Sequence, residues 1–135
     1  MGKTVVLQGL TPEVTVHAFV DLVDSQIKFK AIFKRPSATD ALKIKAELTR
    51  IMTEQIDERF QDEKKSAELT DQANNLIKKW LIRCEALKTE DNKAVDYSDE
   101  LLDQMLGSVG YAKSLGNALG RAANSLSDKN SLRGN

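Results

Sequence analysis

Apolar and polar residues alternate in the first third of the chain, most clearly in residues 27–35, IKFKAIFKR. One face of this segment carries lysines, and the other face is apolar and consists of Ile27, Phe29, Ala31 and Phe33. A period of two predicts a strand with one buried and one solvated face. The earlier stretches TVVLQG and EVTVHAFVDLV are rich in the residue types that suit strands. We therefore predict a hairpin in which residues 14–23 pair with this strand and VDSQ forms the turn.

Pro36 ends the alternation, and the residues after it predict a helix. Ser37 or Thr39 can accept the free amide hydrogens of a first turn, and Asp40 favours the positive end of the helix dipole. Apolar residues then recur with helical spacing at Leu42, Ile44, Leu48, Ile51, Met52, Ile56 and Phe60. The helix either continues through the polar stretch QDEKKSAELTDQ or breaks and restarts there.

Residues 80–87, WLIRCEAL, fit two structures equally well, because their alternation favours a strand while a helix ending near Leu87 also matches the apolar spacing. The following KTEDNKAVDYS is predicted to be a polar connection. Two helices are expected after it, at roughly 98–106 and 109–126, separated by Gly107. Ser98 is placed to open the first of them.

These elements predict a mainly α fold with a small N-terminal β-hairpin, an α+β class with four to five helices. A chain of 135 residues has the size of one domain, which we expect to span residues 1–126. Its β-rich part comprises residues 1–36 and its helical part residues 37–126. Residues 127–135 are predicted to form a flexible tail.

The charges balance, with 20 basic and 20 acidic residues. No basic face accumulates, so the electrostatic footprint of a nucleic-acid-binding protein is missing and nucleic acid is not an expected partner. The apolar run in MGKTVVLQGL is too short for a signal peptide or a membrane span. We therefore expect a soluble, cytoplasmic protein that has no membrane partner.

Residue types that carry chemistry are sparse. Cys84 is the only cysteine and His17 the only histidine, so neither an internal disulfide nor a zinc site of the common kinds is expected. No local signature supports a His–Cys nucleophilic pair. We expect Cys84 to be a small buried residue, and His17 either to cap a strand or to pack beside one. No phosphate-binding glycine loop follows a strand. The protein is therefore not predicted to be an enzyme, and no catalytic residue, metal or cofactor is expected.

The last predicted helix is unusually poor in large side chains. Gly116 and Gly120 lie four residues apart, with Ala112 before them and Ala123 after them. Small residues at this spacing let another helix approach closely, and the segment is too polar for that helix to be a membrane neighbour. The alternative is a weak terminal helix without a binding role, because glycine in a helix interior costs about 1 kcal/mol relative to alanine.

Three stretches occur in an order and spacing that carry a family resemblance. They are IKFKAIFKRPSATDALKI, the lone Trp80 before a polar connection ending in VDYSDELLDQML, and the small-residue helix followed by a tail containing DKN. Together they cover most of residues 27–130, and they resemble the tail assembly chaperones of long-tailed bacteriophages, of the short lambda G type. Members of that family often have glycine in the connection where this chain has Asn92 and Lys93; asparagine can adopt the same left-handed turn.

The resemblance implies a binding function. Such chaperones coat the tape measure protein during tail assembly in the cytoplasm of the bacterial host and are absent from the finished virion. A longer form, made by translational frameshifting, recruits tail tube protein through an extra domain. The resemblance also implies that the protein forms homo-oligomers.

Candidate contacts with the client or with a neighbouring copy lie in the last two predicted helices: Leu101, Leu102, Met105, Leu106, Tyr111, Leu115, Gly116 and Gly120. For the large side chains among them, the alternative is a place in the protein's own core. The alternative function is an unrelated small helical interaction module, either an adaptor or a regulator.

Overall fold

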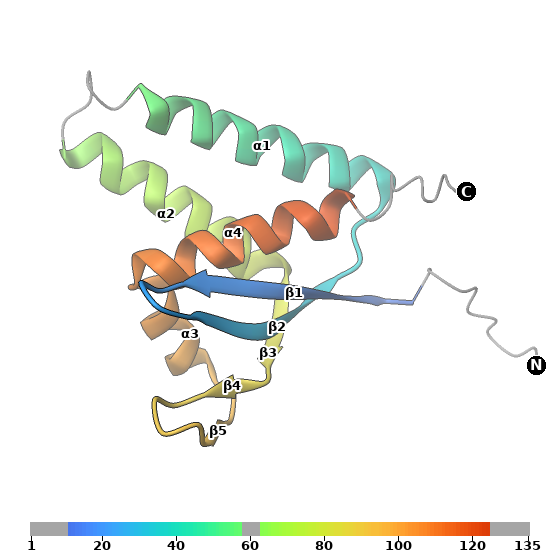
Figure 1. Ribbon diagram of the computed structural model, residues 1–135. Helices are drawn as coiled ribbons and strands as arrows, with labels where there is room; N and C mark the ends of the chain where they lie inside the picture. Colours follow the sequence, from blue (N-terminus) through green and yellow to red (C-terminus); the bar gives the residue numbers. More distant parts are fainter. Residues whose placement is uncertain (1–10, 58–62, 125–135) are drawn as a thin grey trace, which may run out of the picture.

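The computed structural model describes residues 11–57 and 63–124, which form an antiparallel sheet packed against helices (Figure 1). The elements are β1 (Glu13–Asp21), β2 (Gln26–Lys34), α1 (Ala38–Ile56), α2 (Glu63–Trp80), β3 (Leu81–Glu85), β4 (Leu87–Lys88), β5 (Ala94–Val95), α3 (Asp99–Leu106) and α4 (Val109–Asn124). The main sheet has the order β1-β2-β3, and β4 pairs with β5 separately. The predicted α+β class is confirmed, with four helices in the described part of the chain. The predicted strand TVVLQG and the predicted tail 127–135 lie outside the described residues.

The first two strands form the predicted hairpin. They pair antiparallel over their full length, and the amide of Leu22 donates to the carbonyl oxygen of Ser25 across the turn at 2.8 Å. The predicted apolar face of β2 is buried in the core or packed against it: Ile27, Phe29, Ala31 and Phe33. On the lysine face Lys28, Lys30 and Lys34 are exposed as predicted, whereas Ile32 on that face is buried.

Serine side chains begin α1 and α3. Ser37 Oγ accepts the amide hydrogen of Asp40 at 3.0 Å, and Ser98 Oγ accepts that of Leu101 at 3.1 Å. Each hydroxyl thereby satisfies one of the amide groups that a helix leaves free in its first turn. Gly107 follows α3 and separates it from α4, as predicted.

The apolar positions of α1 divide into two groups. Ile44 and Ile51 are buried, whereas the side chains of Leu42, Met52 and Ile56 are 65%, 56% and 74% exposed. The predicted position at residue 60 lies outside the described residues. Helix α1 therefore leaves large apolar side chains exposed in addition to the residues that it buries.

WLIRCEAL divides between the two structures that its pattern allowed. Helix α2 ends at Trp80 and β3 begins at the next residue, so a helix ending near Leu87 is wrong. The pairing of β2 with β3 then shifts its register between Ile32 and Phe33. This bulge places Leu81 and Cys84, three residues apart, on the buried side of the sheet.

The connection after β3 has more structure than its polar composition predicts, because it contains the β4–β5 ribbon. Its turn places Asn92 at φ 65°, the left-handed conformation expected for this asparagine, and the Asn92 amide donates to the carbonyl oxygen of Thr89 at 2.9 Å. Ala86 also has a positive φ, 62°, where the chain passes from β3 to β4. An alanine is strained in this region, so the fold holds it there through its neighbours.

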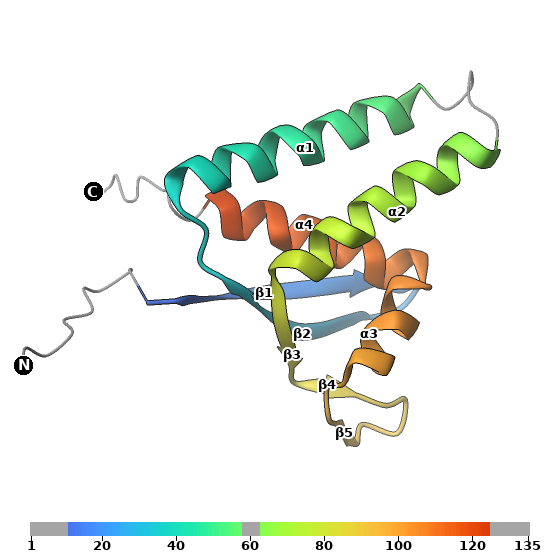
Figure 2. The same cartoon turned by 180° about the vertical axis from the view of Figure 1, so that it is seen from behind.

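Helix α4 occupies the centre of the molecule. Figures 1 and 2 show it lying across the sheet beside β1 and below the pair formed by α1 and α2, and it contacts all of these elements and α3. Its buried residues are Ser114, Leu115, Ala118, Leu119, Ala122 and Ala123. The small-residue helix is thus an integral part of the core and not a frayed terminal segment.

One side of α4 closes tightly on the edge strand β1. A Cβ atom at Gly110 would lie only 3.0 Å from Cγ1 of Val20, so glycine permits this approach. Ser114 Oγ accepts the amide hydrogen of Phe19 at 3.1 Å, and Arg121 Nη2 donates to the carbonyl oxygen of His17 at 2.5 Å. Helix side chains therefore satisfy part of the backbone edge that a fourth strand would otherwise pair with.

Candidate protein-binding groove

The opposite side of α4 forms the floor of a groove whose walls are α1 and α2. The groove has a volume of about 720 Å³. Its floor contains Ala112, Gly116 and Gly120, and its α1 wall contains Leu48 and Met52. Helix α2 contributes the second wall through residues such as Ala73 and Ile77. The groove extends along the whole of α4, from Val109 at its first residue to Asn124 at its last.

The two glycines of the floor have different surroundings. A Cβ atom at Gly120 would lie 3.7 Å from Cδ1 of Leu48, an ordinary contact with the neighbouring α1. At Gly116, by contrast, a Cβ atom would meet no atom within 4 Å, so the space above it is open. Gly120 thus faces α1 at an ordinary contact distance, and the close helix approach predicted from the glycine spacing stays a prediction. At Gly116 the surface is available to another molecule.

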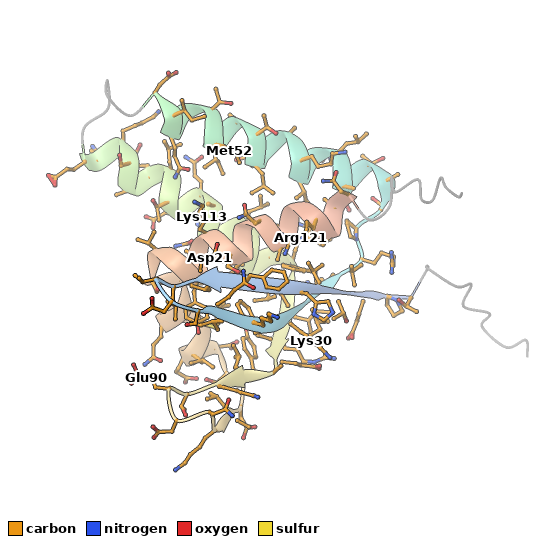
Figure 3. The ribbon with its side chains drawn as sticks, viewed as in Figure 1. Asp21, Lys30, Met52, Glu90, Lys113 and Arg121 are labelled. Carbon is orange, nitrogen blue, oxygen red and sulfur yellow. The ribbon has the colours of Figure 1, made fainter. Side chains whose placement is uncertain are left out.

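Apolar side chains border this open space. Met52, on the α1 wall, and Val109, at the beginning of α4, are 56% and 85% exposed. Figure 3 labels Met52 on α1, which forms one wall of the groove, and Lys113 on α4, which forms its floor. Exposed apolar residues that gather in a concave site, rather than being scattered singly, mark a surface for binding another molecule.

The charge of the groove is of one sign. Among the described residues that line it, Lys45 and Lys113 are charged and none is a carboxylate; the remaining polar groups are neutral amides and hydroxyls such as Asn74, Asn117 and Thr70. The helices α1 and α4 run in opposite directions in Figure 1, and Leu48 lies level with Gly120. Lys45 and Lys113 therefore lie toward opposite ends of the groove.

Polar contacts between α1 and α2 hold the groove walls together. Arg50 of α1 binds Glu47 at 2.6 Å and Glu54 at 2.8 Å, and it also donates to Oε1 of Gln72 on α2. Lys65 of α2 forms a second link to Glu54 at 3.4 Å. Hydrogen bonds from Arg50 lower the pKa of both Glu47 and Glu54, so these carboxylates are ionised at neutral pH. Each pair is exposed and individually weak, but the shared arginine connects the two walls.

The predicted contact residues divide between the core, the groove and a smaller pocket. Leu102, Met105, Leu106 and Leu115 are buried, with exposed fractions of 6%, 5%, 7% and 0%. Leu115 therefore has no surface for a partner, and the core alternative holds for it. Gly116 and Gly120 line the groove, as does one edge of Leu106.

The smaller pocket, of about 210 Å³, lies between α3 and the β4–β5 ribbon. Leu101, Met105 and Tyr111 line it, and the Tyr111 ring packs against Phe29 with centroids 5.6 Å apart. Leu101 and Tyr111 are half-buried there, and Met105 is buried. The groove is the larger of the two surfaces and the one with exposed apolar borders.

Sequence reasoning missed the groove walls, and in particular Met52 and Lys45. One signal was present, because the apolar positions of α1 cover more of the helix circumference than a single buried stripe needs. No sequence signal indicated that Lys45 and Lys113 line the same groove, because this depends on how α1 and α4 cross.

The single cysteine and the single histidine of the chain lie on opposite faces of the main sheet. Cys84 lies on the buried side of the sheet, where burial raises the pKa of its thiol to about 12, as expected for an inert buried cysteine. His17 lies opposite Lys30 in β1, on the solvated face, so the sheet separates the two groups. Within the described ranges, no cluster of three or more His, Cys, Asp or Glu residues is placed to hold a metal ion.

Comparison of the chain with protein-family models, with curated proteins and with solved structures found no match. Among the described helices, none combines the length and the apolar character needed to cross a lipid bilayer. The geometry of the groove is therefore the main basis for considering function.

Proposed function

We propose that this protein is a tail assembly chaperone of a long-tailed bacteriophage, which binds and shields the tape measure protein while the tail is built. The observation that carries this proposal is the open groove along α4, with apolar borders and no side chain above Gly116. The family resemblance of residues 27–130 supports the same function. Both favour a protein that binds another protein.

The groove has the properties that a temporary cover for a long helical client requires. A helix-prone chain with an apolar face aggregates if that face stays exposed before its final partner arrives. A groove lined by helices can cover a few turns of such a face. Each site is weak by itself because it is short, yet many copies along one client bind cooperatively through proximity and can be displaced one at a time.

The proposed function includes further partners. A longer form of the chain, made by frameshifting, brings tail tube subunits to the client, and copies of the chain associate with one another on it. The complex assembles in the cytoplasm of the bacterial host and does not enter the finished virion.

The first experiment expresses the gene in its native locus with an N-terminal tag and identifies the purified proteins by mass spectrometry. We expect a very long helical protein encoded nearby, together with a minor tagged product that extends beyond Asn135. Recovery of the 135-residue form alone, when both genes are shown to be expressed, would favour the unrelated interaction module.

A second experiment measures shielding directly. The long helical protein is produced with and without the chaperone, and its soluble fraction is compared by centrifugation. We expect it to be soluble only in the presence of the chaperone. Equal solubility in both samples would contradict the proposed function.

A further inference from the structure

We infer, resting on the chaperone function proposed above, that the groove binds one amphipathic helix of the client whose apolar stripe is flanked by acidic residues near both ends. The closest approach of this helix is at Gly116. The proposed function already takes the client to be a long helical protein; the acidic residues of the bound segment and its closest approach at Gly116 are additional.

The walls of the groove favour a helix over an extended segment. A bound strand needs free backbone N–H and C=O groups with which to pair, but α1, α2 and α4 use theirs within the helices. The exposed edge of β1 offers such groups, yet Ser114 and Arg121 of α4 already occupy part of it. A helical segment satisfies its own backbone and presents only side chains.

The length of the groove also suits a helix. It follows α4 from Val109 to Asn124, which is about 24 Å at the rise of an α-helix. A small molecule of drug size is better matched by a closed cavity, which would surround most of its surface. Here Met52 and Val109 are exposed along the borders, so a long occupant can lie between them and remain open to solvent on its outer side.

The open floor at Gly116 shows where the partner comes closest. The axes of packed helices lie about 8–10 Å apart, and the distance depends on the side chains between them. Glycine at the contact allows the short end of that range, and nothing within the described protomer uses the space above Gly116. The partner helix is therefore expected to carry small or medium apolar residues at this level.

The charges of the groove determine the polar residues of the partner. Lys45 and Lys113 line it at opposite ends, and no carboxylate among the described residues lines it. With Leu48 level with Gly120, Lys45 lies near the level of residue 123, so the two lysines are separated by roughly 15 Å along α4. Acidic residues about eleven positions apart lie on one face of a helix at that separation.

The test uses two synthetic helical peptides of about 18 residues, with a Leu and Ala stripe and a fluorescent label. One peptide carries Glu at two positions about eleven apart beside the stripe, and the other carries Lys there. Fluorescence anisotropy with the full chain is expected to show at least about tenfold tighter binding of the Glu peptide at low salt, with a smaller difference at high salt. Equal binding of the two peptides, or no binding up to about 1 mM, would overturn the inference.

Matched variants identify the site. The double variant Lys45→Glu and Lys113→Glu is expected to reverse the preference between the peptides, because it reverses the charge at both ends of the groove. The control Lys28→Glu with Lys30→Glu makes the same change in net charge on the solvated face of β2 and is expected to leave the preference unchanged. Reversal by the control pair would show that net charge, and not the groove, selects the peptide.

Gly116→Leu tests whether the partner helix packs against Gly116. The variant is expected to fold normally, because the leucine side chain enters open space. We expect at least about tenfold weaker peptide binding with an unchanged or higher melting temperature, since leucine favours a helix more than glycine does. Undiminished binding would overturn the inference.

The client solubility assay separates this inference from the proposed function. If Gly116→Leu and the wild type keep the client equally soluble, the groove inference fails and the chaperone function stands. If the wild type does not keep the client soluble, the proposed function fails, and binding of the Glu peptide alone then decides whether the groove accepts an acidic amphipathic helix.

Discussion

The two glycine-bearing sides of α4 contrast sharply in what they contact. Toward β1, a Cβ atom at Gly110 would lie 3.0 Å from Val20, and Ser114 bonds the strand backbone. Toward the groove, a Cβ atom at Gly116 would meet nothing within 4 Å. Glycine at the first position serves the fold, whereas glycine at the second reduces helix stability without improving any internal contact. Small residues on one helix can therefore permit close packing within the protein at one position and leave an open surface at another.

The largest expected difference in stability is between a substitution on the core face of α4 and one in the groove wall. Leu115→Ala removes a side chain with no exposed surface and is expected to destabilise the protein by about 2–5 kcal/mol, through lost burial and a cavity. Met52 lies in the groove wall and is 56% exposed, so Met52→Ala is expected to change stability by less than about 0.5 kcal/mol. Urea unfolding followed by circular dichroism measures both, and similar losses for the two variants would mean that the groove is closed in solution.

The same substitution at the two glycines sharpens the comparison directly. Gly110→Leu forces a large side chain against Val20 and is expected to cost about 1–3 kcal/mol. Gly116→Leu enters open space and is expected to be neutral or to stabilise by up to about 1 kcal/mol, because glycine is the poorer helix former. Thermal unfolding of the pair gives the sign of each effect. A strong loss for Gly116→Leu would contradict an open floor.

A smaller effect is expected at the strand edge. Ser114→Ala removes the acceptor of the Phe19 amide hydrogen and is expected to destabilise the protein by about 0.5–1.5 kcal/mol. Hydrogen exchange at the Phe19 amide should accelerate relative to amides that β1 shares with β2. Unchanged exchange would show that α4 does not protect this edge.

The next effect is expected only at alkaline pH. Burial raises the pKa of Cys84 from 9.0 to about 12, so the folded state holds its proton more tightly than the unfolded state does. The resulting stability is fully present below pH 9 and is lost as the pH rises toward 12. Tyr97 contributes in the same direction, because burial, with nearby negative charge, raises its pKa to about 12. Unfolding titrations should show a falling stability above pH 9 that is shallower in Cys84→Ala.

A thiol placed in the groove extends the comparison from stability to access. Cys84 is 3% exposed and protonated at pH 8, so it should react with a thiol reagent only after unfolding. Gly116→Cys should add one thiol that reacts rapidly in the folded protein. Slow reaction at both positions would show that the groove floor is covered.

Local elements were predictable because neighbouring residues determine them. Alternation in residues 27–35 oriented β2, and the hydroxyls of Ser37 and Ser98 defined two helix starts. The glycine spacing at Gly116 and Gly120 predicted a surface for close helix contact, but it could not show that Gly120 faces α1 and that Gly116 faces open space. The bulge near Phe33 was not predictable, because register depends on the partner strand.

The sequence by itself determined the fold class, the hairpin, the helix boundaries near Ser98 and Gly107, and the absence of side-chain bulk along α4, since these follow from local propensity and periodicity. Only the tertiary structure decided that Leu115 belongs to the core, that Met52 remains exposed, and that Lys45 and Lys113 line one groove. The physical reason is that burial and charge pairing depend on how helices cross, and residues far apart in sequence determine that crossing together.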